Sequence, residues 1–144
     1  AHAQLAKLVR TPICLDESIT SAQAAEDAIQ LGACRIINVK PGRVGGYLEA
    51  RRIHDLCASS GVPVWMGGML ETGIGRAGNV AMAAMPNFTL PGDTSASDRY
   101  YGRDITAPFV LREGRLDVPT GPGLGIDVDL EFLESITWWK QTVG

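Results

Sequence analysis

The stretch Arg35-Ile-Ile-Asn-Val-Lys-Pro-Gly-Arg-Val-Gly-Gly46 decides the fold of this 144-residue chain. Its first half is rich in β-branched side chains and stops before Pro41, which predicts a strand over 35–40. The residues that follow, 46–60, carry apolar side chains at helical spacing and precede Gly61, which predicts a helix. A strand followed directly by a helix is the repeating unit of a parallel sheet.

The same alternation continues on both sides of this unit. Short apolar runs predict further strands over 12–16, 62–66 and 87–90, and Ala-rich segments predict helices over 18–31 and near 77–85. The four strand starts are separated by 23, 27 and 25 residues, which is the spacing of strand–helix units. The sequence therefore predicts the α/β class with a parallel sheet.

The pattern changes after Asp93. Three kinds of segment follow it: a predicted β-hairpin over 109–118, a loop rich in glycine and proline over 119–125 and a predicted short helix over 129–136. Trp138 and Trp139 follow that helix, and we expect these large side chains to anchor the tail.

Composition excludes several classes of function. Thirteen Lys and Arg against 16 Asp and Glu give a net charge of -3, so we expect no nucleic-acid partner. No apolar run approaches the roughly 18–20 residues of a membrane helix, and the first ten residues lack the apolar core of a secretion signal. The widely spaced Cys14, Cys34 and Cys57 match neither a disulfide framework nor a zinc site. We expect reduced thiols in a cytoplasmic protein.

Polar residues and glycines follow the ends of the predicted strands, where parallel α/β folds gather ligands and catalytic groups. These residues are Asp16-Glu17, Lys40, Gly67-Gly68-Met69 and Gly92-Asp93. Because side chains alternate along a strand, Asn38 and Lys40 share one face of their strand. Asp16 lies on the corresponding end of the preceding strand, so Asp16 and Lys40 would face one cavity if the sheet closed into a barrel.

Such a pair has a plausible chemistry and several plainer interpretations. A carboxylate suits Mg²⁺, and a dication lowers the pKa of a nearby lysine toward the range of a general base. Together they suit proton abstraction next to a carboxylate. Alternatively, Asp16 and Glu17 could be partners of a helix dipole, and Lys40 a solvated strand end. The segment 42–46 could cradle a phosphate or form a tight turn.

Three longer phrases resemble a known family. They are TPICLDESI at 11–19, INVKPGRVGG at 37–46 and GGMLETGIG at 67–75, and they are supported by PGDTS at 91–95 and VPTGPGLGI at 118–126. These phrases resemble the muconate-lactonizing subgroup of the enolase superfamily. The greatest similarity is to its o-succinylbenzoate synthases and N-acylamino-acid (N-succinylamino-acid) racemases. The resemblance runs from about residue 5 to about residue 130.

The resemblance implies a specific architecture. Residues 1–105 would form the C-terminal half of a (β/α)8 (TIM) barrel, with about four strand–helix units that correspond to the fifth to eighth strands of the family. Residues 106–144 would form the hairpin, the Gly/Pro loop and the tail helix, which would pack on a capping domain. The implied chemistry is removal of a proton α to a carboxylate. It would serve dehydration to o-succinylbenzoate in menaquinone biosynthesis, racemisation of N-acylamino acids, or both.

The resemblance also implies roles for single residues. Asp16 would be the third carboxylate ligand of Mg²⁺, with Mn²⁺ or another divalent ion as an alternative. Lys40 would be the acid/base lysine on one face of the substrate α-carbon, and in the synthase reaction it would stabilise the enolate. The implied substrate-binding residues are Asn38, Gly68, Met69 and Asp93. Gly68 and Met69 would contact the acyl side of the substrate and Asp93 would shape the far wall, while Glu17 would contact the residues that bind the metal and substrate.

A family barrel has eight strands in about 250 residues, so the other metal ligands and a second lysine would come from an N-terminal half. We therefore expect the chain alone to be inactive and to need that half as a partner. We also expect a small carboxylate substrate and a homo-oligomer of the intact enzyme. The alternative is a non-catalytic half-barrel that acts as an assembly or binding module. A third interpretation is a phosphate-binding half-barrel built on 42–46.

Overall fold

The computed structural model describes residues 1–143, so Gly144, the last residue of the predicted C-terminal segment, lies outside it. Its sheet has three parallel strands in the order β1-β2-β3. They are β1 (Cys14–Leu15), β2 (Ile36–Val39) and β3 (Val64–Met66), and they are followed in turn by the helices α2 (Ala22–Gln30), α4 (Tyr47–Ser59) and α5 (Gly73–Ala83). This arrangement confirms the predicted α/β class.

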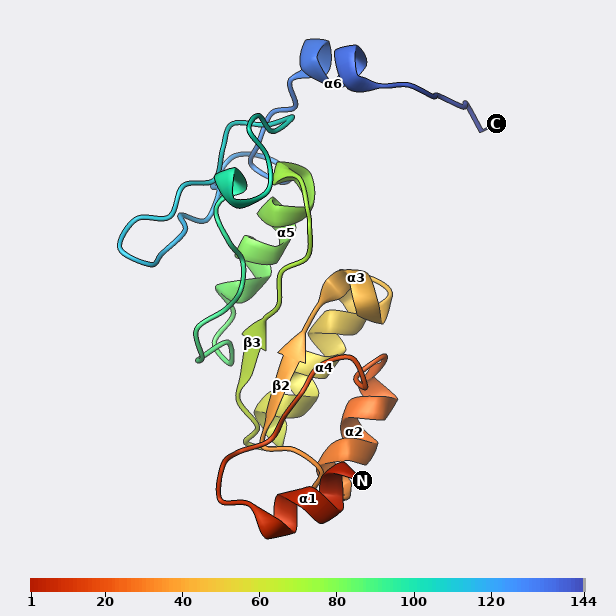
Figure 1. Ribbon diagram of the computed structural model, residues 1–144, viewed down its shortest axis with the longest axis vertical. Helices are drawn as coiled ribbons and strands as arrows, with labels where there is room; N and C mark the ends of the chain where they lie inside the picture. The colour runs from red at the N-terminus through yellow and green to blue at the C-terminus, as the bar shows by residue number, and fades with distance from the viewer. Residues whose placement is uncertain (144) are drawn as a thin grey trace.

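Four further elements complete the fold. They are α1 (His2–Leu8), the one-turn helix α3 (Pro41–Val44), the 3-10 helix η1 (Ser97–Arg99) and α6 (Leu130–Ile136). Figure 1 shows α6 far from the sheet, at the opposite end of the molecule from α1. Among residues 1–143, none of the helices has both the length and the hydropathy that a bilayer crossing requires.

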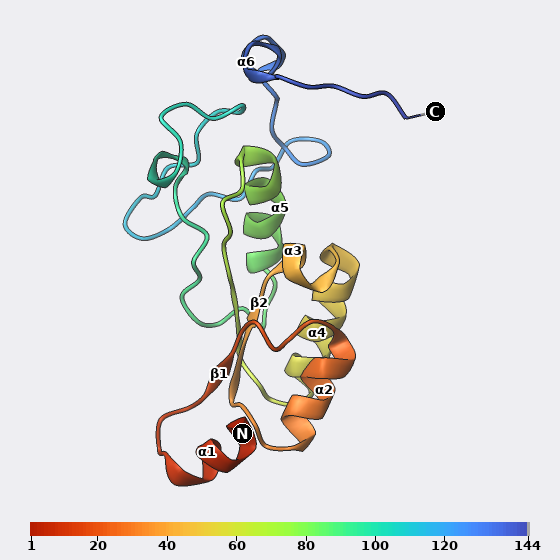
Figure 2. The same cartoon turned by 45° about the vertical axis from the view of Figure 1, so that its right-hand side comes forward.

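The main core lies between one face of the sheet and the helices α2 and α4, which Figure 2 shows on the same side of the strands. Alternate strand residues point into it and are buried: Leu15, Ile37, Val39, Val64 and Met66. Small side chains on the helices, including Ala25 and Ala50, let the helices approach the sheet closely. On the other face lie Asn38, Trp65 and the exposed Cys14, so this is the face that a closed barrel would turn inward.

Two helices begin where distant residues cap them. The prediction placed the start of α2 at residue 18, whereas the helix begins at Ala22. The Ser21 side chain accepts the N–H of Ala24, and the Glu49 carboxylate of α4 accepts the N–H of Ala22 at 2.8 Å. The helix predicted near 77–85 begins earlier, at Gly73, whose N–H donates to the Asp104 carboxylate at 3.1 Å.

The fourth strand predicted over 87–90 is wrong. Only one bridge forms there, a parallel pairing of Val64 with Phe88. The next N–H, that of Thr89, donates to Asn87 instead of to β3, and the chain then reaches Pro91, which has no N–H to continue a ladder.

The hairpin predicted over 109–118 is also reduced to its turn. Arg112 and Arg115 pair across Glu113 and Gly114, whose φ values of 51° and 77° fit a tight turn. The flanking side chains are largely exposed, so no packing extends the pairing into strands.

The tail helix is confirmed. The Asp129 side chain caps α6 by accepting the N–H of Phe132 at 2.9 Å. The expected anchoring by the two tryptophans is wrong for this chain, because Trp138 is 93% exposed and Trp139 is 65% exposed. No part of the chain that the structure describes covers most of either ring.

Candidate active site

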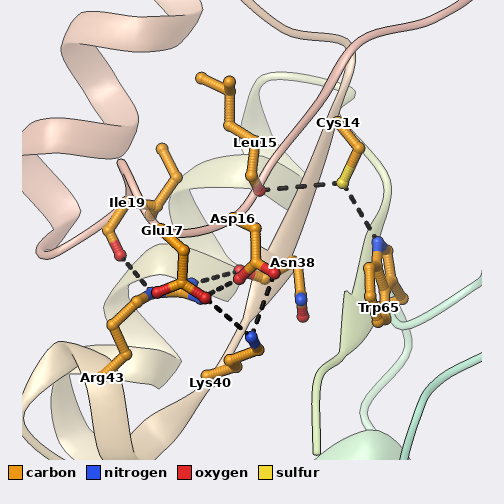
Figure 3. Close-up of polar contacts among 9 residues, drawn as sticks. All are labelled: Cys14, Leu15, Asp16, Glu17, Ile19, Asn38, Lys40, Arg43 and Trp65. Atoms are coloured by element: carbon orange, nitrogen blue, oxygen red, sulfur yellow. Dashed lines mark hydrogen bonds and ion pairs between the residues drawn. The ribbon is translucent and has the colours of Figure 1, made fainter.

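Asp16 and Lys40 meet at one edge of the sheet. Asp16 directly follows β1 and Lys40 directly follows β2, and the carboxyl ends of neighbouring parallel strands lie side by side. The Lys40 Nζ lies 3.1 Å from Asp16 Oδ2 and 3.0 Å from Glu17 Oε1 (Figure 3). The structure therefore brings together the lysine and the two carboxylates that the strand ends indicated.

Arg43 completes this cluster, although the sequence pattern predicted no separate role for it. Its guanidinium binds Asp16 Oδ1 and donates to the carbonyls of Ile19 at 2.8 Å and Asn38 at 2.6 Å (Figure 3). Pro41 starts the single turn of α3, which places Arg43 one helical turn after Lys40. A proline just after a strand is the sequence signal that could have predicted this turn. Both carboxylate oxygens of Asp16 are consequently engaged by cations.

The segment 42–46 forms a turn rather than an anion cradle. The N–H groups of Arg43 and Val44 donate to the carbonyl of Lys40, and the N–H of Gly46 donates to Pro41. Gly45 and Gly46 have φ values of 93° and 119°, which a residue with a side chain rarely adopts. Because these N–H groups are already bonded, the geometry favours the tight-turn interpretation over a phosphate site.

Two opposing effects act on the pKa of Lys40 in this arrangement. Partial burial lowers the pKa of Lys40, but the hydrogen bonds to Glu17 and Asp16 and the charges of these carboxylates outweigh that effect and raise the pKa above its usual value. The two carboxylates therefore favour the ammonium form of Lys40 in this arrangement. The lowering expected beside a bound dication concerns a different state of the site and stays a prediction.

Asn38 lies on β2, two residues before Lys40, on the face that a closed barrel would turn inward. It is 1% exposed, and neither its Oδ1 nor its Nδ2 has a hydrogen-bond partner among the described residues. Buried amides are seldom left unpaired, so this one is available to a ligand. Gly67 makes room for it, because a Cβ there would collide with the Asn38 amide and lie 2.7 Å from Lys40 Cγ.

The remaining predicted residues continue the same edge beyond β3. Gly68 packs against the carbonyl of Asp93 so closely that a Cβ would collide with it. The N–H of Asp93 donates to Met66 at 2.8 Å, which ties its loop to the end of β3. The Asp93 side chain is exposed and Met69 is 51% exposed. Two loops are therefore in backbone contact beside the cluster of Lys40 and Asp16.

Asp16 fits one position of a Mg²⁺ site, but this chain does not form the whole site. The Asp16 side chain is 38% exposed and has hard oxygen donors, but both oxygens are paired here, one with Lys40 and one with Arg43. Within residues 1–143 there is no group of three or more His, Cys, Asp or Glu side chains that could hold a metal ion. Since Mg²⁺ demands near-octahedral oxygen coordination, these residues alone do not fit it.

Comparison with known proteins identifies close relatives. Residues 1–132 match the family model described as enolase C-terminal domain-like. The N-succinylamino acid racemase of Amycolatopsis sp. is 67% identical over 143 residues, which cover 99% of this chain and 39% of that protein. The o-succinylbenzoate synthase of Geobacillus kaustophilus is 58% identical over 141 residues, which cover 97% of this chain and 38% of that protein.

Solved structures agree with these matches. A member of the enolase superfamily from Listeria innocua superposes with a TM-score of 0.89 at 49% identity, over 93% of this chain and 36% of that one. A dipeptide epimerase from Cytophaga hutchinsonii, complexed with Mg and a dipeptide, superposes with a TM-score of 0.85 at 27% identity, over 94% of this chain and 37% of that one. This chain thus spans about two fifths of the length of its relatives. The resemblance carried by the strand-end phrases is confirmed, and the chain belongs to the enolase C-terminal domain-like family.

Proposed function

We propose that this chain supplies the C-terminal half of the active site of an enzyme that removes a proton α to a carboxylate. Its reactions are the racemisation of N-succinylamino acids and the dehydration that forms o-succinylbenzoate in menaquinone biosynthesis. The observation that carries this proposal is the meeting of Lys40 and Asp16 at the carboxyl ends of β1 and β2. The racemase and synthase names of relatives at 67% and 58% identity support the two reactions.

Lys40 is the proton-transfer group for racemisation in this proposal, and in the synthase reaction it stabilises the enolate. In its ammonium form it delivers a proton to one face of the substrate α-carbon after a base on the opposite face has removed one. In the reverse direction its neutral amine takes the proton. The base on the other face comes from a segment outside this sequence, as do the missing carboxylates. We therefore propose that the chain alone is inactive.

Asp16 would hold Mg²⁺ together with those carboxylates, and the metal would supply positive charge at the substrate carboxylate. Changing Asp16 to Asn removes a charged ligand but keeps the shape of the side chain. We expect the Mg²⁺ concentration needed for half-maximal activity to rise by about tenfold or more, as is usual when a metal site loses a supporting group. Asp27→Asn, on the exposed face of α2, is the control. An equal metal requirement in the two variants would remove Asp16 from the ligand set.

The proposal is tested in a chimera in which this chain replaces the 143 matching residues of the Amycolatopsis racemase. We expect the chimera to racemise N-succinylamino acids and to exchange the α-proton in D₂O. Lys40→Ala should lower exchange on one face by about 10²–10⁴-fold, whereas Lys7→Ala, on the exposed surface of α1, should not. Exchange at both faces at the unaltered rate would exclude the assigned role.

The non-catalytic module makes the opposite prediction. It requires a chain that folds alone, together with a chimera that neither racemises nor exchanges the α-proton. Circular dichroism of the isolated chain and the exchange assay on the chimera separate the two functions.

A further inference from the structure

Glu71 links the loop after β3 to two helices. Its Oε2 accepts the N–H of Met69 at 2.8 Å, and its Oε1 accepts the Nδ2 of Asn79 at 2.9 Å. Asn79 lies on α5, is only 3% exposed and in turn accepts the hydroxyl of Tyr47 from α4 at 3.1 Å. The Glu71 carboxylate thus fixes the backbone of Met69, a residue predicted to contact the acyl side of the substrate, to the framework of α4 and α5.

The ring of Tyr47 lies directly against α5. A Cβ at Gly78 would lie 2.5 Å from the Tyr47 Cζ, so a side chain there would push the half-exposed ring away. Burial raises the pKa of Tyr47, and the nearby charge of Glu71 raises it further. The phenol therefore stays protonated and continues to donate its hydrogen bond.

Arg76 joins the same loop to a second loop. This residue is fully buried, and its guanidinium donates to the carbonyls of Glu71, at 2.9 Å, and Ser95. It also lies 5.9 Å from the ring centroid of Tyr100. None of these partners is a carboxylate, and burial of a cation without one is costly. What the cation gains in return is a pair of hydrogen bonds that hold two separate loops at a set distance.

These two loops carry the residues predicted to contact substrate beyond β3. Gly68 and Met69 belong to the first loop and Asp93 to the second, and the loops touch where Gly68 meets the carbonyl of Asp93. Among the described residues, the hydrogen bonds of the Glu71 and Arg76 side chains go to Met69, Asn79, Ser95 and Glu71 itself, and none goes to Lys40 or Asp16.

We infer that Glu71 and Arg76 are positioning residues that set the shape of the acyl-binding side of the site and so determine which N-acyl group the enzyme accepts. This inference rests on the proposed function. Because the two side chains are bonded to the loops and not to the proton-transfer cluster, their effect falls on substrate binding rather than on the removal of the α-proton.

The test compares Glu71→Ala with Glu71→Gln and Glu26→Ala in the chimera. Glu26 is the matched control, since it is partly exposed and accepts two side-chain amides but lies on α2. For Glu71→Ala we expect the KM for an N-succinylamino acid to rise about tenfold, the loss typical of a hydrogen bond to a charged group. We expect kcat and α-proton exchange per turnover to stay within about threefold. The preference for N-succinyl over N-acetyl substrates should change, because the first loop is no longer held.

Glu71→Gln should recover most of the affinity, since its amide oxygen can still accept the N–H of Met69. If Glu71→Ala does not fold, Arg76→Lys takes its place, because lysine keeps the charge but cannot bridge two carbonyls as a fork does. The inference is overturned if the KM and acyl preference match those of Glu26→Ala, or if kcat falls while the KM is unchanged.

Titration calorimetry with the N-succinylamino acid separates this inference from the proposed function. A chimera without turnover contradicts the proposed function. The inference is supported if Glu71→Ala then binds about tenfold more weakly than the unaltered chimera, and it is overturned if the two bind equally or neither binds.

Discussion

Residues 1–90 pack an extended apolar core between three strands and the helices α2 and α4, although Leu8 and Leu48 stay exposed. Residues 91–143 bury few large apolar side chains and leave Val110, Leu130 and Ile136 more than half exposed. The second region adds one small cluster, in which Phe109 packs on Ala77 and Val80 of α5. Both regions contain similar apolar residue types. The difference shows that an apolar side chain stabilises a fold only where a second element presents a matching surface.

Hydrogen bonds, more than buried apolar side chains, hold residues 91–143 in place. Two hydrogen bonds join Phe109 to Ser97. The Phe109 carbonyl accepts the N–H of Ser97 at 2.9 Å, and the Phe109 N–H donates to Ser97 Oγ at 3.0 Å. The carboxylate of Asp104 holds the N-terminus of α5. Regions attached by a few such contacts open at lower free energy than a packed core, so we expect residues 91–143 to exchange their amide hydrogens first.

The largest effect should come from the core. Ile37→Ala removes a fully buried side chain of β2 and should lower the free energy of unfolding by about 2–5 kcal/mol. Ile136→Ala removes the same atoms from a side chain that is 53% exposed on α6 and should change it by less than about 0.5 kcal/mol. Urea unfolding of both variants measures the difference. Equal losses would show that α6 is packed in solution and that the two regions do not differ.

The junction of the two regions should show an intermediate effect. A Cβ at Gly73 would collide with the Oγ1 of Thr106 and lie 2.8 Å from its Cβ, so Gly73→Ala should cost about 1–3 kcal/mol. Gly42→Ala is the control, because no atom lies within 4 Å and helical propensity favours alanine by up to about 1 kcal/mol. Denaturation midpoints compare the two, and Thr106→Ala should restore part of the loss in the double variant. A Gly73→Ala protein as stable as Gly42→Ala would show that the second region is not held against α5.

The smallest expected effect is on the stability of the protein at acidic pH. The backbone N–H of Ala22 and the side chain of Arg52 lower the pKa of Glu49, and the N–H of Phe132 and the side chain of Arg103 lower that of Asp129. A carboxyl whose pKa is lower in the folded state adds stability above its unfolded pKa, about 4, and that stability is lost as the pH falls through the folded value. NMR titration should show both groups below their usual pKa.

The consequences of these two titrations should differ between the regions. Glu49 joins α2 to α4 in the core, so Glu49→Gln should reduce the acid dependence of global unfolding. Asp129 caps α6 and pairs with Arg103, and both contacts lie within residues 91–143. Asp129→Asn should therefore loosen that segment with little effect on global unfolding. If Asp129→Asn changed global unfolding as much as Glu49→Gln, the acid data would contradict the proposed separation.

The order of the main elements was predictable from the chain because it depends on local pattern. Alternating runs of β-branched and Ala-rich residues sufficed for the three strands and for α2 and α4. The strand predicted over 87–90 was wrong because strand pairing also requires a neighbouring strand with free backbone groups. The residues of the segment itself do not show whether such a neighbour exists. The predicted start of α5 was wrong for a related reason, since the carboxylate that stabilises its first turn belongs to Asp104, 31 residues from Gly73.

The candidate site divides in the same way. Asp16 and Lys40 could be paired from the sequence alone, because each follows a strand and the carboxyl ends of neighbouring parallel strands must meet at one edge. The partners of Arg43, Glu71 and Arg76 could not be predicted, although Pro41 signals the turn that carries Arg43. These partners, Asp16, Met69 and Ser95, are set by how loops and helix turns pack in three dimensions. The sequence by itself thus determined which residues reach the edge of the sheet. Only the tertiary structure decided what holds them there, because hydrogen bonds between segments depend on distances that no local pattern contains.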